Sequence, residues 1–321
     1  MQSHLLHPHL ATRGLVAAAV KRDLSQSLRG AEFYPLVYRA VPVYLVAAGV
    51  ISVASGASFG IPFVVAALLV VAGWFWVAPR LVWILGTTAL AVALFFGLDG
   101  FSDRASQITH VTAPIDFEKW LTGGGSFVVW AQTTFLANPL HYVLSPFLVA
   151  AYMSLWFGPL LAAYWLWTRH SDWLGRFATG FLLLECVGFL LYFLFPETPP
   201  WLASQQGYLP ALHREVVNAL TPFFGLGRDY ANSDPAPLSA MPAMHVAVPM
   251  LVGWVMFAVS RGHRFAWAWF LYPLSVATAV LVFAEHYLID VLVAVLLGTL
   301  AFWVSQAVFR RRPRLIEARH A

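Results

Sequence analysis

The stretch HYLIDVLVAVLLGTLAFWVSQAVF, residues 286–309, decides the kind of fold to expect from this chain. From Val291 to Phe309 it contains no charged residue, and a run of about 20 mostly apolar residues can cross the hydrocarbon core of a bilayer as a helix. Several earlier runs have the same character, so we predict an all-α, polytopic helical membrane protein with about eight transmembrane helices. The predicted spans are about 41–58, 61–78, 81–98, 142–167, 177–196, 244–260, 265–284 and 287–309.

The composition also indicates a lipid environment. Of 321 residues, 60% are hydrophobic and only 11% are charged, whereas soluble domains carry about 25% charged residues. The single cysteine, Cys186, excludes an intramolecular disulfide framework. The formal net charge of +4 is spread over loops and a terminal cluster, so it does not indicate nucleic-acid binding. The expected partners are membrane lipids.

Basic residues are distributed unevenly over the predicted loops. With the N-terminus placed in the cytoplasm, all but four of the 19 lysines and arginines fall on the cytoplasmic side. The positive-inside rule therefore predicts that both termini are cytoplasmic. The four basic residues on the outer side are Arg104, Lys119, Arg214 and Arg228.

Two regions are predicted along the chain. Residues 1–33 mix apolar and basic side chains, so they form either an interfacial amphipathic helix or a disordered cytoplasmic tail. Residues 34–321 form a single integral membrane domain, and its candidate catalytic residues fall within 196–290.

Two histidines and one aspartate fall at the same, non-cytoplasmic boundary of the predicted spans. His286 and Asp290 are four residues apart, so on a helix they share one face and the carboxylate can hold an imidazole nitrogen. A histidine oriented in this way is a better base or nucleophile. His245 heads an earlier apolar run and can supply the proton that a leaving group needs. The three residues predict a composite active site.

Three segments, in this order, resemble motifs of the phosphatidic-acid-phosphatase type 2 superfamily. MPAMH at 241–245 resembles the second motif, Pro-Ser-(Leu)-His, and HYLID at 286–290 resembles the third motif, His-x-x-x-Asp. TPPW at 198–201 resembles the Ala-Pro-Pro-Trp stretch of the branch that contains fungal inositol phosphorylceramide synthase, the aureobasidin-resistance protein. The resemblance covers about residues 142–309 and implies a six-helix, lipid-phosphatase-like core.

The resemblance implies a role for each matched residue. His286 would attack phosphorus and form a phosphohistidine, Asp290 would orient it, and His245 would protonate the leaving oxygen. Pro200 and Trp201 would shape the headgroup site. No cofactor is expected, and no cluster of histidine, cysteine and acidic residues has the spacing of metal ligands.

The chain also departs from the family pattern. The first motif, Lys-x6-Arg-Pro, is missing, and Val280 stands where the family has an arginine. Ala243, which is expected to border the substrate, replaces the serine of the second motif. Cations that bind phosphate must therefore come from elsewhere. Arg214 and Arg228, in the predicted external loop before His245, are the candidates.

These features predict a membrane lipid phosphotransferase that transfers a phosphate-containing headgroup, like inositol phosphorylceramide synthase. A lipid phosphate phosphatase that hydrolyses a phosphomonoester or pyrophosphate lipid is the alternative, because water can resolve the same phosphohistidine. A third reading is a non-catalytic, degenerate family member or a lipid carrier, and the missing first motif supports it.

Overall fold

The computed structural model describes residues 15–19, 21, 109–155, 157–221, 227, 238 and 240–310. Within these residues every regular element is helical, and the one strand-like contact is an isolated bridge between His110 and Glu197. The predicted all-α class is confirmed. The predicted spans 41–58, 61–78 and 81–98 lie outside the described residues, as does Arg228.

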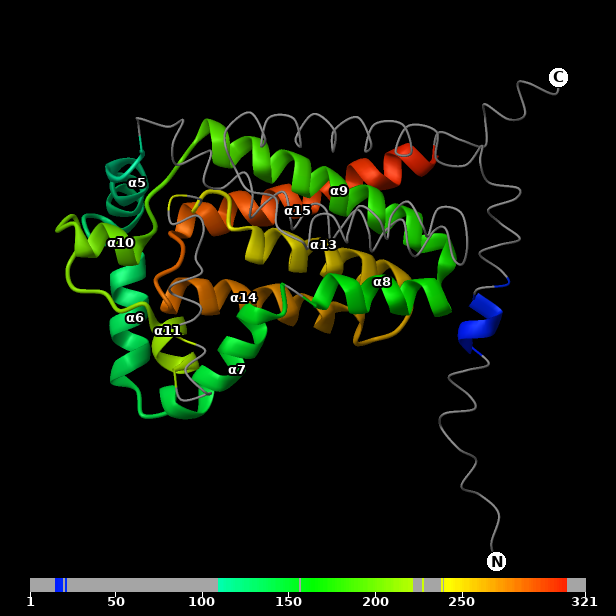
Figure 1. Cartoon of the computed structure of the whole chain (residues 1–321), viewed down its shortest axis with the longest axis horizontal. Coiled ribbons are helices and arrows are strands. Elements are labelled where there is room, and N and C mark those ends of the chain that lie inside the picture. The colour runs from blue at the N-terminus through cyan, green and yellow to red at the C-terminus, as the bar shows by residue number, and fades with distance from the viewer. Residues whose placement is uncertain are drawn as a thin grey trace, which may run out of the picture. The chain divides into compact units, whose positions relative to one another are not determined.

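The elements follow one another along the chain as short and long helices (Figure 1). They are α5 (Thr112–Thr122), α6 (Phe127–Ala137), α7 (His141–Met153), α8 (Gly158–Arg169), α9 (Ser171–Leu194), α10 (Pro200–Gln205), α11 (Glu215–Leu220), α13 (Met244–Val259), the 3-10 helix η1 (Ala266–Phe270), α14 (Leu271–Val282) and α15 (Leu288–Arg310).

The chain divides into two compact units. The first comprises residues 1–97 and 160–179, and the second comprises residues 98–159 and 180–321. In the first unit, residues 15–19 of the predicted N-terminal tail are helical. The second unit contains the described members of the predicted site.

Two of the described helices are long and apolar enough to cross a membrane. They are Ser171–Tyr192 within α9 and Leu288–Phe309 within α15, and they match the predicted spans 177–196 and 287–309. The predicted spans 244–260 and 265–284 appear as shorter apolar helices, α13 and η1 with α14. These helices fit an integral membrane protein, while the total of eight spans and the six-helix core stay predictions.

The predicted span 142–167 is divided between two helices in the structure, because the chain breaks between α7 and α8. At the break, the Ser154 hydroxyl donates to the carbonyl of Ala151 and lies 2.8 Å from the Tyr272 hydroxyl. A serine side chain that bonds a carbonyl of the preceding turn weakens helix continuation. The tyrosine also fills the space beside Gly158, where a Cβ would lie 2.7 Å from its hydroxyl oxygen. Apolar periodicity does not reveal this interruption.

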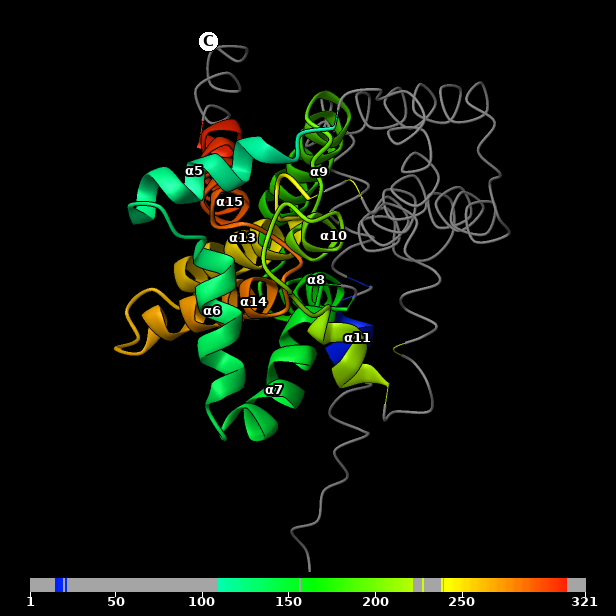
Figure 2. The same cartoon turned by 90° about the vertical axis from the view of Figure 1, so that its left-hand side faces the viewer.

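Helices α13 and α15 pack closely along their length (Figures 1 and 2). A Cβ at Gly298 of α15 would lie 2.5 Å from the carbonyl oxygen of Ala247 in α13, so only glycine permits this approach. The Trp254 indole donates to the Thr299 hydroxyl at 3.0 Å across the same interface. Small residues at a crossing allow helix backbones to come together. The crossing brings the first turns of α13 and α15 to the same end.

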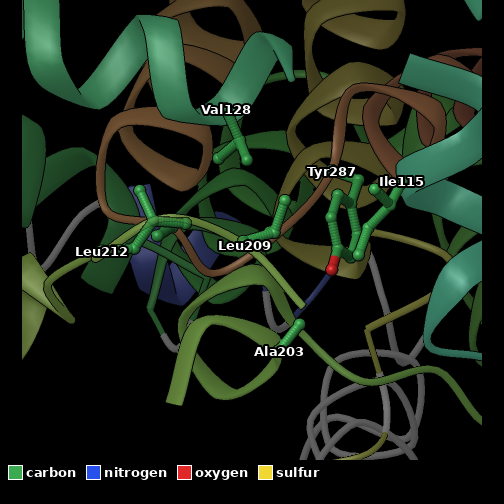
Figure 3. Close-up of a cluster of buried hydrophobic side chains, with 7 residues drawn as sticks. Ile115, Val128, Ala203, Leu209, Leu212 and Tyr287 are labelled. Atoms are coloured by element: carbon green, nitrogen blue, oxygen red, sulfur yellow. The ribbon is translucent and has the colours of Figure 1, made fainter. Parts of the chain in front are cut away.

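A cap formed by α5, α6 and α10 lies at that end (Figure 2). Helix α5 contacts α15, and α6 contacts α14. Buried apolar side chains of the cap and of the loop after α10 form a cluster with Tyr287, the residue that follows His286 (Figure 3). The cluster therefore fixes the segment that carries the predicted nucleophile. Its buried members are Ile115, Val128, Ala203, Leu209, Leu212, Ala284 and Tyr287.

Candidate active site

A tight turn between α14 and α15 carries His286. Ala284 adopts a left-handed conformation with φ of 57°, which reverses the chain after α14. The backbone N–H groups of Glu285 and His286 both donate to the carbonyl of Val280, at 3.0 and 3.3 Å. His286 thus lies in a turn, two residues before α15 begins. The sequence predicted that His286 and Asp290 share one helix face. In the structure only Asp290 lies on the helix, and His286 precedes it.

Two carboxylates accept the first backbone N–H groups at the start of α15. Asp290 Oδ2 accepts from the N–H of Tyr287 at 2.8 Å, as the third residue of a helix does in a capping box. Glu118 Oε1, from α5, accepts from the N–H of Leu288 at 3.0 Å. Its other oxygen accepts from the Ser126 hydroxyl at 2.6 Å. Glu118 is fully buried, so α5 stabilises the beginning of α15.

The His286 ring is held by a backbone carbonyl. Its Nδ1 lies 2.7 Å from the carbonyl oxygen of Ala240 and 3.6 Å from Asp290 Oδ2. Because a carbonyl oxygen only accepts hydrogen bonds, Nδ1 carries the proton and Nε2 of the neutral ring keeps its lone pair. Asp290 is within ion-pair range, but the hydrogen bond that sequence spacing assigned to it belongs to Ala240. The residue just before the second-motif segment therefore orients the histidine of the third motif.

His245 lies in the first turn of α13, close to His286. The two ring centroids are 5.9 Å apart with an interplanar angle of 54°. The ring of His245 stacks on Tyr152 of α7, with centroids 4.2 Å apart and planes inclined by 11°. Tyr152 is buried and in turn contacts the edge of Phe283. The two predicted histidines are thus brought together, and an aromatic stack sets the plane of the second.

Arg214 is engaged by a carboxylate next to His286. Its Nε and Nη2 donate to the two oxygens of Glu285 at 2.8 and 3.1 Å, and its guanidinium lies 4.4 Å from the centroid of the Trp201 ring. Gln132 of α6 holds the preceding peptide, because it both donates to the carbonyl and accepts from the N–H of His213 at 2.8 Å. Arg214 is therefore near the site, and its role as a phosphate ligand stays a prediction.

The remaining predicted residues border the same turn. Trp201 donates its backbone N–H to the carbonyl of Ala284 at 3.1 Å. Pro200 is buried and begins α10, a position that suits proline because its missing N–H has no partner there in any helix. Ala243 is fully buried, and its N–H donates to the carbonyl of Asp290 at 3.4 Å. The second motif, the third motif and the Pro-Pro-Trp segment are therefore linked through their backbones.

Several residues of this site were not predicted. Glu118, Gln132 and Tyr152 are all buried and come from α5, α6 and α7. The sequence offered one signal for them, which is that each has a polar group within an apolar or aromatic segment. Their partners lie far away in the sequence, up to 170 residues for Glu118 and Leu288, so the sequence gives no indication of what they contact.

Among the described residues, no group of three or more histidine, cysteine and acidic side chains is arranged to hold a metal ion. The reaction without a metal stays a prediction. What the arrangement can do chemically follows from two imidazoles with ring centroids 5.9 Å apart. The Nδ1 of His286 is bound by a carbonyl, so that Nε2 of its neutral ring has a lone pair, and His245 lies on a separate helix.

The sequence is similar to those of known proteins. The PAP2 superfamily matches residues 113–304, more than half of the chain. A phosphoinositol dihydroceramide synthase from Bacteroides thetaiotaomicron is 28% identical over 141 residues, which are 40% of this chain and 45% of that protein. The match thus spans less than half of the relative's length. No solved structure matches. The extent of the family match, together with its span over both histidine motifs, shows that the chain belongs to the PAP2 superfamily.

Proposed function

We propose that the protein is a membrane lipid phosphotransferase that moves a phosphate-containing headgroup, such as phosphoinositol, from a donor lipid to an acceptor lipid alcohol. The observation that carries the proposal is the pair of histidines, with rings 5.9 Å apart and with the Ala240 carbonyl on Nδ1 of His286. This arrangement leaves Nε2 of His286 as a nucleophile beside an independent proton donor.

In the first half-reaction, Nε2 of His286 attacks the phosphorus of the donor lipid. The bond between phosphorus and the lipid oxygen breaks, and His245 gives that oxygen its proton, so that a lipid alcohol leaves. The headgroup phosphate stays on His286 as a phosphohistidine. Asp290 Oδ2, 3.6 Å from Nδ1, stabilises the positive charge that develops on the imidazole.

In the second half-reaction, the acceptor alcohol gives its proton to His245 and attacks phosphorus. The bond between phosphorus and Nε2 breaks, and the enzyme returns to its starting state. Water in place of the alcohol would give hydrolysis. Phosphoryl transfer depends mainly on positioning and on stabilising spread negative charge, so cations near the phosphate matter in both steps.

Arg214 is proposed as one such cation. Its guanidinium is already within the site, bound to Glu285 and lying over Trp201. A phosphate could share the fork of N–H donors, because an arginine presents five of them. Arg228 is proposed as a second cation on sequence grounds alone.

Two observations favour transfer over hydrolysis. One relative that is similar to this chain is a phosphoinositol dihydroceramide synthase. The Pro-Pro-Trp segment, which resembles the synthase branch, is joined to the turn of His286 by the hydrogen bond from Trp201 to Ala284. Both support an acceptor site beside the phosphohistidine.

The deciding experiment uses purified protein in detergent with EDTA, a headgroup-labelled phosphatidylinositol donor, and dihydroceramide present or absent. Mass spectrometry follows both lipid products. We expect labelled phosphoinositol dihydroceramide only when the acceptor is present, and an acid-labile phosphoenzyme that is missing from His286→Ala. Release of inositol phosphate at the same rate without acceptor would support the phosphatase. No product with any lipid phosphate, in a well-folded sample, would support the non-catalytic reading.

We also propose that both termini are cytoplasmic and that the site faces the opposite side. Cysteine labelling in cells tests this in a Cys186→Ala background. Tyr208→Cys, in an exposed position after α10, should react with a membrane-impermeant maleimide. His263→Cys, in the exposed loop after α13, should react only after the membrane is permeabilised. The reverse pattern would invert the topology.

A further inference from the structure

Glu197 lies at the junction of three segments beside the active site. Its N–H donates to the carbonyl of Leu238 at 2.7 Å, and its own carbonyl accepts from the N–H of Ala240 at 3.4 Å. The adjoining Thr198 donates to the carbonyl of His110 at 3.2 Å. Ala240 is the residue whose carbonyl holds His286. The backbone of Glu197 is thus two hydrogen bonds away from the proposed nucleophile.

The side chain of Glu197 is buried against other acids. Its exposed fraction is 1%, and that of Asp290 is 0%. In the part of the chain that the structure describes, no arginine or lysine forms an ion pair with Glu197. The charged groups that act on it are instead the carboxylates of Asp290 and Glu118. Burial, followed by the charge and hydrogen bond of Asp290, raises the pKa of Glu197 well above its usual value.

The hydrogen-bond pattern indicates where the proton belongs. Glu197 Oε1 and Asp290 Oδ1 are both buried and have no donor as partner. Two ionised carboxylates can only accept hydrogen bonds, so neither can donate to the other, and a neighbouring like charge disfavours ionisation of Glu197. One proton between the two groups satisfies both oxygens. The other oxygen of Asp290, Oδ2, accepts from the N–H of Tyr287 and lies 3.6 Å from His286 Nδ1.

We propose that Glu197 is a positioning residue that stays protonated and donates its hydrogen bond to Asp290, so that the two groups share one negative charge. The proposal rests on the proposed function, in which Asp290 stabilises the imidazolium of His286. The neutral acid fixes the carboxylate plane, because it holds Oδ1 while Oδ2 points to His286. It also avoids adding a second negative charge beside a substrate that is itself anionic.

The test compares Glu197→Gln with Glu197→Ala. Glutamine keeps the shape and a hydrogen-bond donor but cannot ionise, so it should retain most of the wild-type kcat. Alanine leaves Asp290 Oδ1 without a donor and should lower kcat by about 10–100-fold, the size of loss found for outer-shell partners that orient metal ligands, with little change in KM. Glu215→Gln is the matched control, because the carboxylate of Glu215 accepts a hydrogen bond from Asn218 within α11. If Glu197→Gln is as inactive as Glu197→Ala, Glu197 exchanges its proton during the reaction and the proposal is wrong.

A second measurement does not depend on activity. Infrared spectra of wild type at neutral pH should contain a carboxylic-acid C=O band that is missing from Glu197→Gln and present in Glu215→Gln. Absence of a difference would show that Glu197 is ionised, which overturns the proposal even if both variants turn over. If wild type transfers no headgroup to any lipid but the band is present, the proposed function fails while the protonated pair stands.

Discussion

The segments that carry His286 and His245 are held in different ways. His286 is buried in a turn, with its Nδ1 bound by a carbonyl and with carboxylates covering the backbone N–H groups that follow it. His245 lies on a regular helix, is half-buried, and has its plane set by stacking on Tyr152. A fixed ring with one free nitrogen suits a nucleophile. Stacking contacts the face of the ring and leaves its in-plane nitrogens able to exchange protons, which suits an acid and base that serves two different oxygens.

The largest effect on activity is expected from substitution of His286, whose ring is held in the turn. His286→Ala should lower kcat by about 10⁴-fold or more, because removal of a nucleophile leaves only binding and electrostatic contributions. Headgroup transfer in detergent is the measurement, and a phosphoenzyme trap should find no labelled protein. His263→Ala, an exposed histidine in the loop after α13, is the matched control and should behave as wild type. Residual transfer through a phosphoenzyme in His286→Ala would contradict the assignment.

The second prediction concerns the proton donor. His245→Ala should lower turnover of a natural lipid by about 10²–10⁴-fold, which is the typical contribution of a positioned acid. A nitrophenyl phosphate ester should be affected far less, because its leaving oxygen needs no proton. The ratio of the two losses is the readout. Equal losses on both substrates in His245→Ala, with rescue by the nitrophenyl ester in His286→Ala, would show that the two roles are reversed.

The difference between the two segments also explains which parts of the site could be predicted. Helices α13 and α15 were recognisable because each is an apolar run headed by a histidine. The meeting of His245 and His286 followed from charge asymmetry, which put both at the same membrane boundary. The hydrogen bond from His286 to Ala240 was not predictable, because any residue type can offer a backbone carbonyl and this one lies 46 residues away. Helical spacing therefore predicted Asp290, and not Ala240, as the hydrogen-bond partner of His286.

The break between α7 and α8 was missed for a similar reason. It depends on the Tyr272 hydroxyl, which packs against Ser154 and Gly158 from a helix more than a hundred residues later. Composition shows where apolar segments lie, whereas interruptions and hydrogen-bond partners depend on tertiary contacts.

A third prediction tests whether Arg214 binds the substrate or only stabilises the turn between α14 and α15. Hydrogen bonds between charged groups contribute about 1.5–3 kcal/mol, so Arg214→Ala should raise KM for the donor lipid by about 10-fold or more. Glu285→Gln weakens the hold on the guanidinium and should leave KM unchanged or lower. Steady-state kinetics with varied donor lipid separates the two variants. If both lower kcat and thermal stability to the same extent, Arg214 only braces the turn against Glu285, and the phosphate role is wrong.

The smallest effect is expected at the stacking partner of His245. A stacked pair of rings contributes about 0.5–1.5 kcal/mol beyond its burial, so Tyr152→Ala should lower kcat on natural lipid by about 3- to 10-fold. Tyr152→Phe keeps the aromatic face and should retain more of the activity than Tyr152→Ala. Tyr142→Ala, an exposed tyrosine on the same helix, controls for general damage to α7. With the nitrophenyl ester, the difference between Tyr152→Ala and wild type should shrink, because the stack acts only through the proton donor. A loss of equal size on both substrates would mean that Tyr152 supports the packing of α7 rather than the plane of His245.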